Sequence, residues 1–270
     1  MKLAFSTLGC PEWEWSDVVS AASDLGYDGM EIRGLSNELY VPAIPEFSPR
    51  CVGQTRERLK NLGLAIPCLT SACVIGAEEG YDSALAEGRA YIDTAQAVGA
   101  EFVRVMCEDT AAPEKTVVEA LVKKALTGLG NYAAARGVTV LLETNGWYAD
   151  SARLAGLFSG LNAPGVGILW DIHHPYRFFN ESPALTASRI GKWVRYIHVK
   201  DSILSDGKVR YKMLGEGNLP IKDFLTALDD IGYDGWYTLE WIRRWDMTLE
   251  EPGIAFAHYI GYLRDLNNKG

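Results

Sequence analysis

Eight short apolar segments recur along the chain, and longer amphipathic segments separate them from the first residues to the last. Short apolar runs are typical of strands that are buried on both faces, as in parallel sheets, whereas the longer segments have the spacing of helices. The alternation therefore predicts a repeated βα plan. The predicted strands are Lys2–Ser6, Gly29–Arg33, Ala65–Thr70, Phe102–Met106, Thr139–Glu143, Gly167–Asp171, Tyr196–Lys200 and Tyr237–Glu240.

The segments between the strands carry signals for the beginnings and ends of helices. Asp17 and Ser83 are predicted N-terminal caps, because a short polar side chain can accept hydrogen bonds from the first free N–H groups of a helix. A glycine follows each of five helices and can adopt the left-handed conformation that ends them. The helices are Asp17–Leu25, Pro49–Leu62, Ser83–Val98, Glu114–Arg136 and Ile221–Asp230, and the glycines are Gly26, Gly63, Gly99, Gly137 and Gly232.

The sequence LGYDG at residues 25–29 returns as IGYDG at residues 231–235, which supports repeated βα units. Eight such units form either a doubly wound sheet or a closed barrel, and the barrel is the commoner solution because it leaves no strand edge unpaired. The chain has no G-x-G-x-x-G after its first strand and no Walker A motif, so the nucleotide-binding signatures of open sheets are missing. We predict a single (β/α)8 TIM barrel, one α/β domain over residues 1–270.

Charge and the N-terminal sequence restrict the partners. The net charge of −9 argues against binding to nucleic acid, which draws affinity from basic side chains that neutralise phosphates. Only a short apolar run precedes Pro11 and Glu12, too short for a signal peptide or a membrane span. We therefore expect a cytoplasmic protein without a membrane partner. The five cysteines form no CxxC pair, which favours reduced, mostly buried thiols.

Each of the last four predicted strands ends in a side chain that can bind a metal ion. The C-terminal strand ends of a barrel converge on one mouth, so these side chains can meet although they are far apart in sequence. Three carboxylates and one imidazole are an oxygen-rich set that suits Mn2+, Mg2+ or Co2+, and Zn2+ stays open. We predict one divalent metal ion, with Mn2+ as the first choice. The predicted metal ligands are Glu143, Asp171, His198 and Glu240.

Simpler explanations exist for each of these residues alone. A carboxylate at a strand end can cap the next helix, and a histidine such as His198 can be a hydrogen-bonded core residue. Four successive strand ends favour the metal site, because burying several charges without a partner is costly. The LGEGN sequence at residues 214–218 is either a flexible loop or a loop that binds substrate or phosphate.

These residues resemble the xylose isomerase-like superfamily of sugar isomerases and epimerases, which includes hydroxypyruvate isomerases, ketose 3-epimerases and inositol-catabolism enzymes. Its members carry Glu, Asp-x-x-His, His and Glu on the last four barrel strands. This chain matches the second element with Asp171 and His174. The resemblance covers nearly the whole chain and includes HVKD at residues 198–201 and GEGNLP at residues 215–220. It is specific for the superfamily and its metal site, and less so for the reaction.

The resemblance implies that one divalent ion binds two adjacent oxygens of a hydroxy-ketone or an aldose. Glu143 and Glu240 then lie on opposite faces of the carbon that loses a proton, and one of them takes the proton that the other, or a water, returns. The ion favours this step because it stabilises the enediolate. His174 is expected to bind a substrate oxygen, and for His173 we favour a structural role.

One position departs from the ketose 3-epimerases, which carry an arginine six residues beyond the metal-binding histidine. This chain has Leu204 there. Arg210 or Lys212 is a candidate to reach the same volume, and Lys200 follows the strand end that carries His198. The predicted substrate-binding residues are His174, Lys200 and Arg210.

The predicted protein is a metal-dependent isomerase or epimerase of a free keto-sugar, aldose or cyclitol, and its resemblance implies a homo-oligomer. A metal-dependent lyase or dehydratase is the first alternative, because elimination from a 3-keto-glycoside or an inosose uses the same acid–base pair and ion. An apurinic endonuclease needs more metal ligands than a chain with four histidines and a negative charge offers. A non-catalytic sugar-binding subunit predicts a degraded ligand set, and this set is whole.

Overall fold

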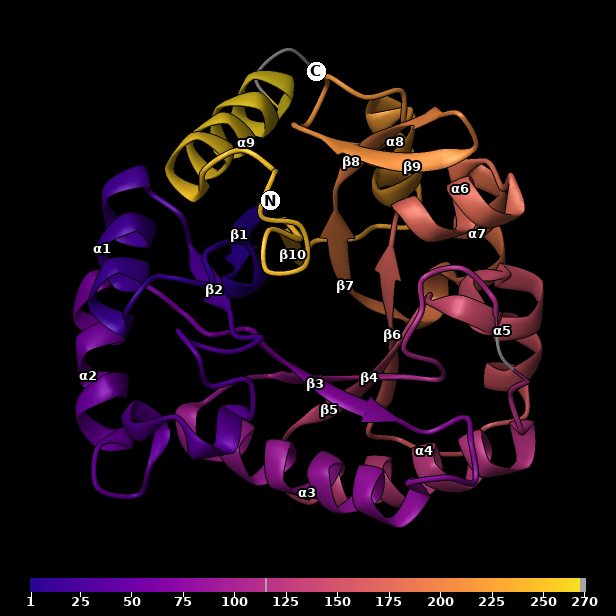
Figure 1. The fold of residues 1–270 in the computed structure, drawn as a ribbon. Helices are drawn as coiled ribbons and strands as arrows, with labels where there is room; N and C mark the ends of the chain where they lie inside the picture. Colours follow the sequence, from indigo (N-terminus) through magenta and orange to yellow (C-terminus); the bar gives the residue numbers. More distant parts are fainter. Residues whose placement is uncertain (115, 268–270) are drawn as a thin grey trace.

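The computed structural model describes residues 1–114 and 116–267, and within these ranges eight parallel strands form a barrel surrounded by helices (Figure 1). The fold is therefore the predicted (β/α)8 TIM barrel. Its strands are β1 (Lys2–Ser6), β2 (Gly29–Glu31), β3 (Cys68–Val74), β4 (Phe102–Met106), β5 (Thr139–Glu143), β6 (Val166–Asp171), β7 (Val194–Val199) and β10 (Trp236–Leu239).

The strands pair in the order β2-β1-β10-β7-β6-β5-β4-β3. Single bridges between the first and last of these, Gly29 with Ala65 and Ile32 with Leu69, bring the ring to closure. The Met30 N–H supports it by donating to the Ala65 carbonyl at 3.0 Å. A ring of this kind leaves little of the sheet edge open to another chain.

The predicted strand bounds are confirmed for β1, β4 and β5, and the other strands shift by a few residues. The largest shift is at β3, which begins at Cys68 rather than at Ala65. Pro67 precedes it and has no N–H to donate to a neighbouring strand. Strand β7 ends at Val199, so Lys200 lies just past the strand and not within it.

Helices form the outer layer of the barrel (Figure 1). All five glycines predicted to end helices have positive φ values, from 68° to 85°, so that prediction is confirmed. The helices are α1 (Trp15–Leu25), α2 (Val52–Leu62), α3 (Tyr81–Val98), α4 (Glu119–Ala134), α5 (Ser151–Ser159), α6 (His173–Phe179), α7 (Pro183–Ile190), α8 (Ile221–Asp230) and α9 (Pro252–Asn267).

The two predicted helix caps are wrong. Helix α1 follows Glu14, and Asp17 lies in its first turn, where its carboxylate accepts the Glu14 N–H at 3.1 Å. The two side chains form a capping box, in which the third helical residue reaches back to the cap. Helix α3 begins at Tyr81 after Gly80, so Ser83 lies inside the first turn.

Two further predicted helices are shorter in the structure. Helix α2 begins at Val52 rather than at Pro49, because residues 45–47 already form a separate short 3₁₀ turn that redirects the chain. Helix α4 covers Glu119–Ala134 rather than 114–136. The first turn predicted for it includes Lys115, which lies outside the described residues.

The barrel interior below its mouth is filled by apolar side chains that are separate from the larger core between strands and helices. Side chains on a strand alternate between its two faces, so the residue two positions further along also points into the barrel. Glu143, Asp171 and His198 each lie two positions after a residue of this apolar cluster. The interior cluster consists of Ala4, Cys68, Phe102, Leu141, Leu169, Tyr196 and Trp236.

The cysteines agree with the predicted reduced state. All five are free, and only Cys51 is partly exposed. Among residues 1–114 and 116–267, no helix combines the length and the apolar character that a membrane crossing requires.

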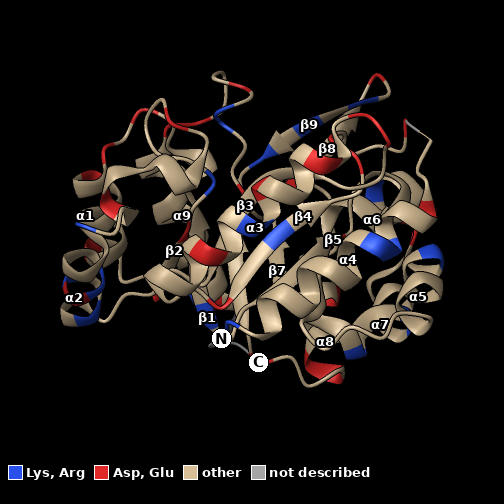
Figure 2. Ribbon diagram, turned by 90° about the horizontal axis from the view of Figure 1, so that it is seen from below, with Lys and Arg blue, Asp and Glu red and all other residues tan. Residues whose placement is uncertain are grey.

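A two-stranded antiparallel hairpin that the sequence analysis did not predict follows β7. It consists of β8 (Asp201–Ser205) and β9 (Lys208–Lys212). Figure 2 shows it at the end of the barrel opposite the N-terminus. Its strands are short and mostly exposed or half-buried, so they lack the apolar run that predicts a buried strand.

The loop after this hairpin is held by a buried carboxylate. Asp201 accepts the backbone N–H groups of Gly215, Gly217 and Leu219 at 2.9 to 3.1 Å. The N–H groups of Glu216 and Asn218 donate to the carbonyls of Met213 and Ser202. The interpretation of residues 214–218 as a flexible loop is therefore wrong, because the loop is anchored. The N–H groups of residues 215–218 have partners within the protein, so they do not form a phosphate cradle, and a substrate contact by this loop stays a prediction.

The anchor predicts a large stability effect. Asp201→Ala should lower the free energy of unfolding by about 3 kcal/mol, because it leaves several buried N–H groups without an acceptor. Urea denaturation measures the effect. Asp223→Ala, on the exposed face of α8, is the matched control and should change stability by less than about 0.5 kcal/mol. Equal stability of Asp201→Ala and the wild type would contradict this role.

Candidate metal and substrate site

The four residues predicted as metal ligands meet at the C-terminal end of the barrel. One ligand atom from each lies within 4.8 Å of the others, and all four side chains are buried. A single cation at their centre can therefore contact all four. The residues, here called the cluster, are Glu143, Asp171, His198 and Glu240.

His198 is oriented by Glu31, a carboxylate at the end of β2. The His198 Nε2 lies 2.8 Å from the Glu31 Oε2, and both side chains are fully buried. When the ring is neutral, Nε2–H donates to Glu31 and Nδ1 keeps its lone pair. Nδ1 faces the cluster, 3.4 Å from Glu240 and 3.9 Å from Glu143, and finds no hydrogen-bond partner in the part of the chain that the structure describes. A carboxylate behind the imidazole is usual for histidines that bind metal ions.

Lys200 places an ammonium group among the candidate ligands. Its Nζ lies 2.6 Å from the Asp171 Oδ2 and also contacts the Glu240 Oε2. Burial disfavours the charged ammonium, but Asp171 and Glu240 outweigh that effect and hold the pKa of Lys200 well above its usual value. The centre of the cluster thus favours positive charge.

The two glutamates of the cluster have different environments. Burial raises the pKa of Glu143 to about 7, although the Arg104 Nε lies only 3.2 Å from the Glu143 Oε2. Burial also acts to raise the pKa of Glu240, but Lys200 and His198 outweigh it and hold that pKa far below its usual value. Without an ion, Glu240 is therefore ionised at neutral pH, and Glu143 is only partly so.

The buried charges around the cluster also shift the pKa of His198. Burial alone would lower the pKa of His198, but Glu31 and Glu240 raise it to about 9. The ring is therefore protonated at neutral pH in the absence of an ion, and the second proton occupies Nδ1, the atom that faces the cluster. A cation at the centre would replace that proton.

The charges around the cluster do not balance. Counted with neutral imidazoles and ionised carboxylates, four buried carboxylates face two buried cationic side chains, so two positive charges are missing. Without an ion, the protons on His198 and in part on Glu143 supply some of that charge. Buried charges are costly unless they are paired or bind a metal. One divalent ion would supply the missing charge, and the donor set suits such an ion. The carboxylates are Glu31, Glu143, Asp171 and Glu240, and the cations are Arg104 and Lys200.

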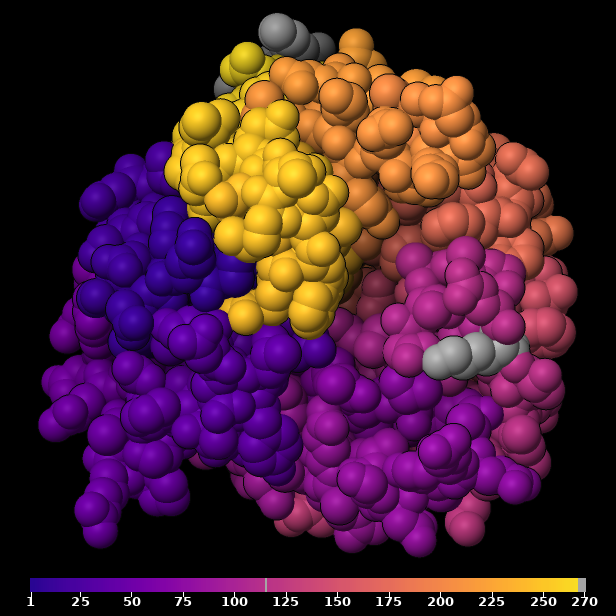
Figure 3. Space-filling model, in the orientation of Figure 1, coloured from indigo at the N-terminus to yellow at the C-terminus, as the bar shows by residue number. Residues whose placement is uncertain are grey.

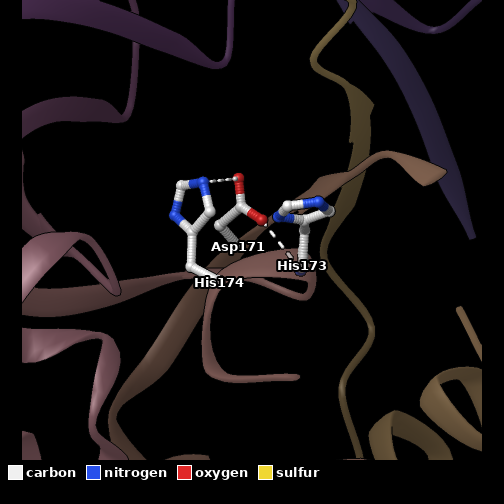
Figure 4. Close-up of side chains that lie close together, drawn as sticks. All are labelled: Asp171, His173 and His174. Atoms are coloured by element: carbon white, nitrogen blue, oxygen red, sulfur yellow. Dashed lines mark hydrogen bonds and ion pairs between the residues drawn. The ribbon is translucent and has the colours of Figure 1, made fainter. Parts of the chain in front are cut away.

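His174 is a neutral acceptor beside the cluster. Its Nδ1 lies 2.9 Å from the Thr144 carbonyl, which places the ring proton on Nδ1. Nε2 then carries a lone pair and lies 3.7 Å from the Asp171 Oδ2 (Figure 4). Burial lowers the pKa of His174 to about 4, so the ring is uncharged at neutral pH.

His173 lies on the other side of Asp171 (Figure 4). Its Nε2 forms a hydrogen bond of 2.9 Å with the Ser202 Oγ, and its ring stacks on the Tyr211 ring with 5.4 Å between the centroids. These contacts fix the start of the hairpin against α6. They agree with the structural role that the sequence analysis favours.

A pocket of about 410 Å³ opens onto the cluster. Figure 3 shows a recess between the yellow C-terminal segment and the magenta middle of the chain. The volume lies in the range of sites for small molecules. Its lining includes Arg33, Arg104, Glu143, His174, Lys200 and Glu240.

Of the predicted substrate-binding residues, His174 and Lys200 line this pocket and Arg210 does not. Arg210 is exposed on β9, and the next residue, Tyr211, lines the pocket instead. Side chains alternate along a strand, so the hairpin can present only one of the two to the site. Leu204, on β8, is also exposed.

Sequence reasoning missed Glu31, Arg33 and Arg104. Each is a charged residue within or just past an apolar strand, two positions from other inward or mouth-facing residues. The same signal identifies the four cluster residues in the second half of the barrel. A search for charged strand-end residues in the first half would have found them.

The chain belongs to the family of xylose isomerase-like TIM barrels, whose family model matches residues 19–266. The resemblance seen in the sequence is therefore confirmed. The proteins that the chain is similar to include sugar epimerases.

Fructoselysine 3-epimerase of Shigella flexneri is 22% identical to this chain over 281 residues, with 98% of each chain covered. The structure of the IolI protein with a bound zinc atom has a TM-score of 0.81 at 19% identity and covers 100% of this chain and 99% of its own. The structure of 3-keto-D-glucoside 4-epimerase, YcjR, from E. coli has a TM-score of 0.74 at 20% identity, with coverage of 98% and 99%. The two structures show that the fold is shared.

Proposed function

We propose that this protein is a divalent-metal-dependent isomerase or epimerase of a keto-sugar, an aldose or a cyclitol. The observation that carries the proposal is the buried cluster in which three carboxylates and the His198 Nδ1 face one point. The family and the similarity to a sugar epimerase support the substrate class. The negative charge of the chain argues against a nucleic-acid partner. We expect a cytoplasmic homo-oligomer.

Glu143, Asp171, His198 and Glu240 would hold the ion, with Mn2+ as the first choice and Mg2+, Co2+ or Zn2+ as alternatives. The two missing positive charges support a divalent species. When bound, such an ion polarises substrate oxygens and makes the neighbouring C–H bond more acidic. Lys200 would then turn from the carboxylates toward a substrate oxygen in the pocket that it lines.

Glu143 and Glu240 are the proposed acid–base pair. Strands β6 and β7 separate β5 from β10 in the ring, so the two carboxylates approach the pocket from different sides. One takes a proton from carbon, and the other delivers a proton to the opposite face of that carbon or to its neighbour. The first outcome is epimerisation and the second is isomerisation.

His174 and Tyr211 would position the sugar. The His174 Nε2 can accept a hydrogen bond from a hydroxyl group because its ring is neutral and its proton lies on Nδ1. The Tyr211 ring also lines the pocket and stacks on His173. A fixed substrate pose brings the reacting C–H close to the carboxylates.

Proton exchange tests the chemistry. In D2O with Mn2+, the protein should incorporate deuterium next to the carbonyl of at least one compound in a panel of ketoses, inososes and 3-keto-glycosides, as followed by NMR. Glu240→Gln should keep the fold and lower the exchange rate by about 1,000-fold, because it removes the base. Glu216→Gln, in the exposed part of the anchored loop, is the control and should exchange at the wild-type rate.

Near-wild-type exchange in Glu240→Gln, or exchange that a chelator does not reduce, would contradict the proposal. The product separates the alternatives. A changed stereocentre or a moved carbonyl identifies the epimerase or isomerase, whereas an unsaturated product identifies the lyase.

Glu31 should control the affinity for the ion. Glu31→Gln should weaken Mn2+ binding by about 10- to 100-fold, because the amide no longer holds the His198 ring in the tautomer that presents Nδ1. Isothermal titration calorimetry measures the affinity. Glu181→Gln is the control: Glu181 is another buried carboxylate, which accepts a hydrogen bond from Thr186 away from the cluster. This variant should leave the affinity for Mn2+ unchanged. If both variants weakened Mn2+ binding equally, the effect would come from the loss of a buried charge in general, and the specific role of Glu31 would be contradicted.

A further inference from the structure

Arg33 is a buried cation at the pocket. It follows β2, its exposed fraction is 8%, and its side chain lines the pocket that opens onto the cluster. Strand β2 also carries Glu31, which points to His198. One short segment thus supplies the carboxylate behind the cluster and the guanidinium beside it.

The Arg33 guanidinium lacks an anionic partner. Within the described ranges, no carboxylate lies within 4.0 Å of it. Its side chain makes a long hydrogen bond of 3.5 Å to the Leu39 carbonyl and lies 5.9 Å from the Trp245 ring. Arginine is rarely buried without a partner, because removing its charge from water is costly. Apart from the bond to the Leu39 carbonyl, the five N–H donors of the Arg33 guanidinium have no partner among the described residues.

The other buried cations around the pocket are paired. Arg104 contacts Glu143, Lys200 contacts Asp171 and Glu240, and Arg243, which follows β10, contacts Glu251. Arg33 instead has further positive charge nearby. Burial lowers the pKa of the Arg33 guanidinium. The charges of Arg104 and Arg244 add to that effect, and those of Tyr91 and Glu87 oppose part of it. This part of the pocket therefore attracts an anion.

The charge balance of the site also indicates an anion beside Arg33. With one divalent ion bound, the carboxylates of the cluster and of Glu31 are balanced by the ion, Arg104 and Lys200. Among the described residues, the positive charge of Arg33 then has no carboxylate within 4.0 Å, and the more distant Glu87 offsets only part of it. A substrate with one anionic group would supply the missing negative charge and would leave its reacting oxygens free for the cluster.

We propose that Arg33 forms an anion subsite and that the substrate is a sugar derivative with a carboxylate or phosphate group remote from its reacting carbon. The proposal rests on the proposed function and narrows its substrate class. It departs from the uncharged sugar that the sequence favours. A guanidinium binds either group through two parallel hydrogen bonds. The pocket of about 410 Å³ has room for a six-carbon chain beside that group.

Binding of matched polyols tests the subsite without catalysis. D-Glucitol, D-gluconate and D-glucitol 6-phosphate have the same length and differ in charge, and calorimetry gives their affinities for the Mn2+-loaded protein. At least one of the two anions should bind about tenfold more tightly than glucitol. The preferred anion identifies the group as a carboxylate or a phosphate.

Variants of Arg33 and Arg244 test which residue causes the preference for an anion. Arg33→Gln should abolish it and leave glucitol affinity and metal content unchanged, whereas Arg33→Lys should retain part of it. Arg244→Gln is the matched control, because Arg244 adds charge nearby, does not line the pocket and donates to the Ser36 carbonyl. It should retain the preference.

The absence of any anion preference in the wild type, or a preference that survives in Arg33→Gln, would overturn the proposal. Glu240→Gln separates this failure from failure of the proposed function. That variant should lose proton exchange and keep the anion preference. If wild-type protein shows the preference without exchange, the subsite stands and the proposed reaction fails.

Discussion

Side chains on a β-strand point alternately to its two faces, and in a closed parallel barrel one of those faces is the interior. Apolar residues such as Leu141 and Leu169 fill the lower interior, and the next inward position on the same strands carries Glu143 and Asp171. The register pairs Asp171 with His198, and the ligand atoms of Glu143 and Glu240 lie within 4.8 Å of theirs. The convergence of the charged side chains is a consequence of this alternation and of the barrel's closure.

Burial makes the charges at that level depend on one another. Glu31 fixes His198, Arg104 lies against Glu143, and Lys200 joins Asp171 to Glu240. Each contact offsets part of the cost of removing charge from water, but the sum leaves the cluster short of positive charge. A divalent ion and an anionic substrate together would complete the balance, with Arg33 beside the substrate. The same electrostatic deficit therefore underlies both the proposed ion and the proposed subsite.

The barrel and the four cluster residues could be predicted from the sequence, because buried parallel strands are apolar and a charged residue at their end stands out. Glu31 and Arg104 carry the same signal, but their pairing with His198 and Glu143 could not be predicted, since it depends on strands far away in the sequence. The hairpin after β7 was missed because its strands are short and half exposed. The anchoring of the GEGNLP loop could not be predicted, because its partner, Asp201, comes fourteen residues before Gly215 and binds it only in the folded chain.

The most direct test of the central claim is a crystal structure of the protein loaded with Mn2+, with an anomalous difference map recorded at the Mn absorption edge. One peak should lie within about 2.5 Å of an oxygen of Glu143, Asp171 and Glu240 and of the His198 Nδ1. Lys200 should have moved away from Asp171. A map without a peak in the cluster, with Lys200 still bridging Asp171 and Glu240, would mean that the four residues form a structural ion-pair network and not a metal site.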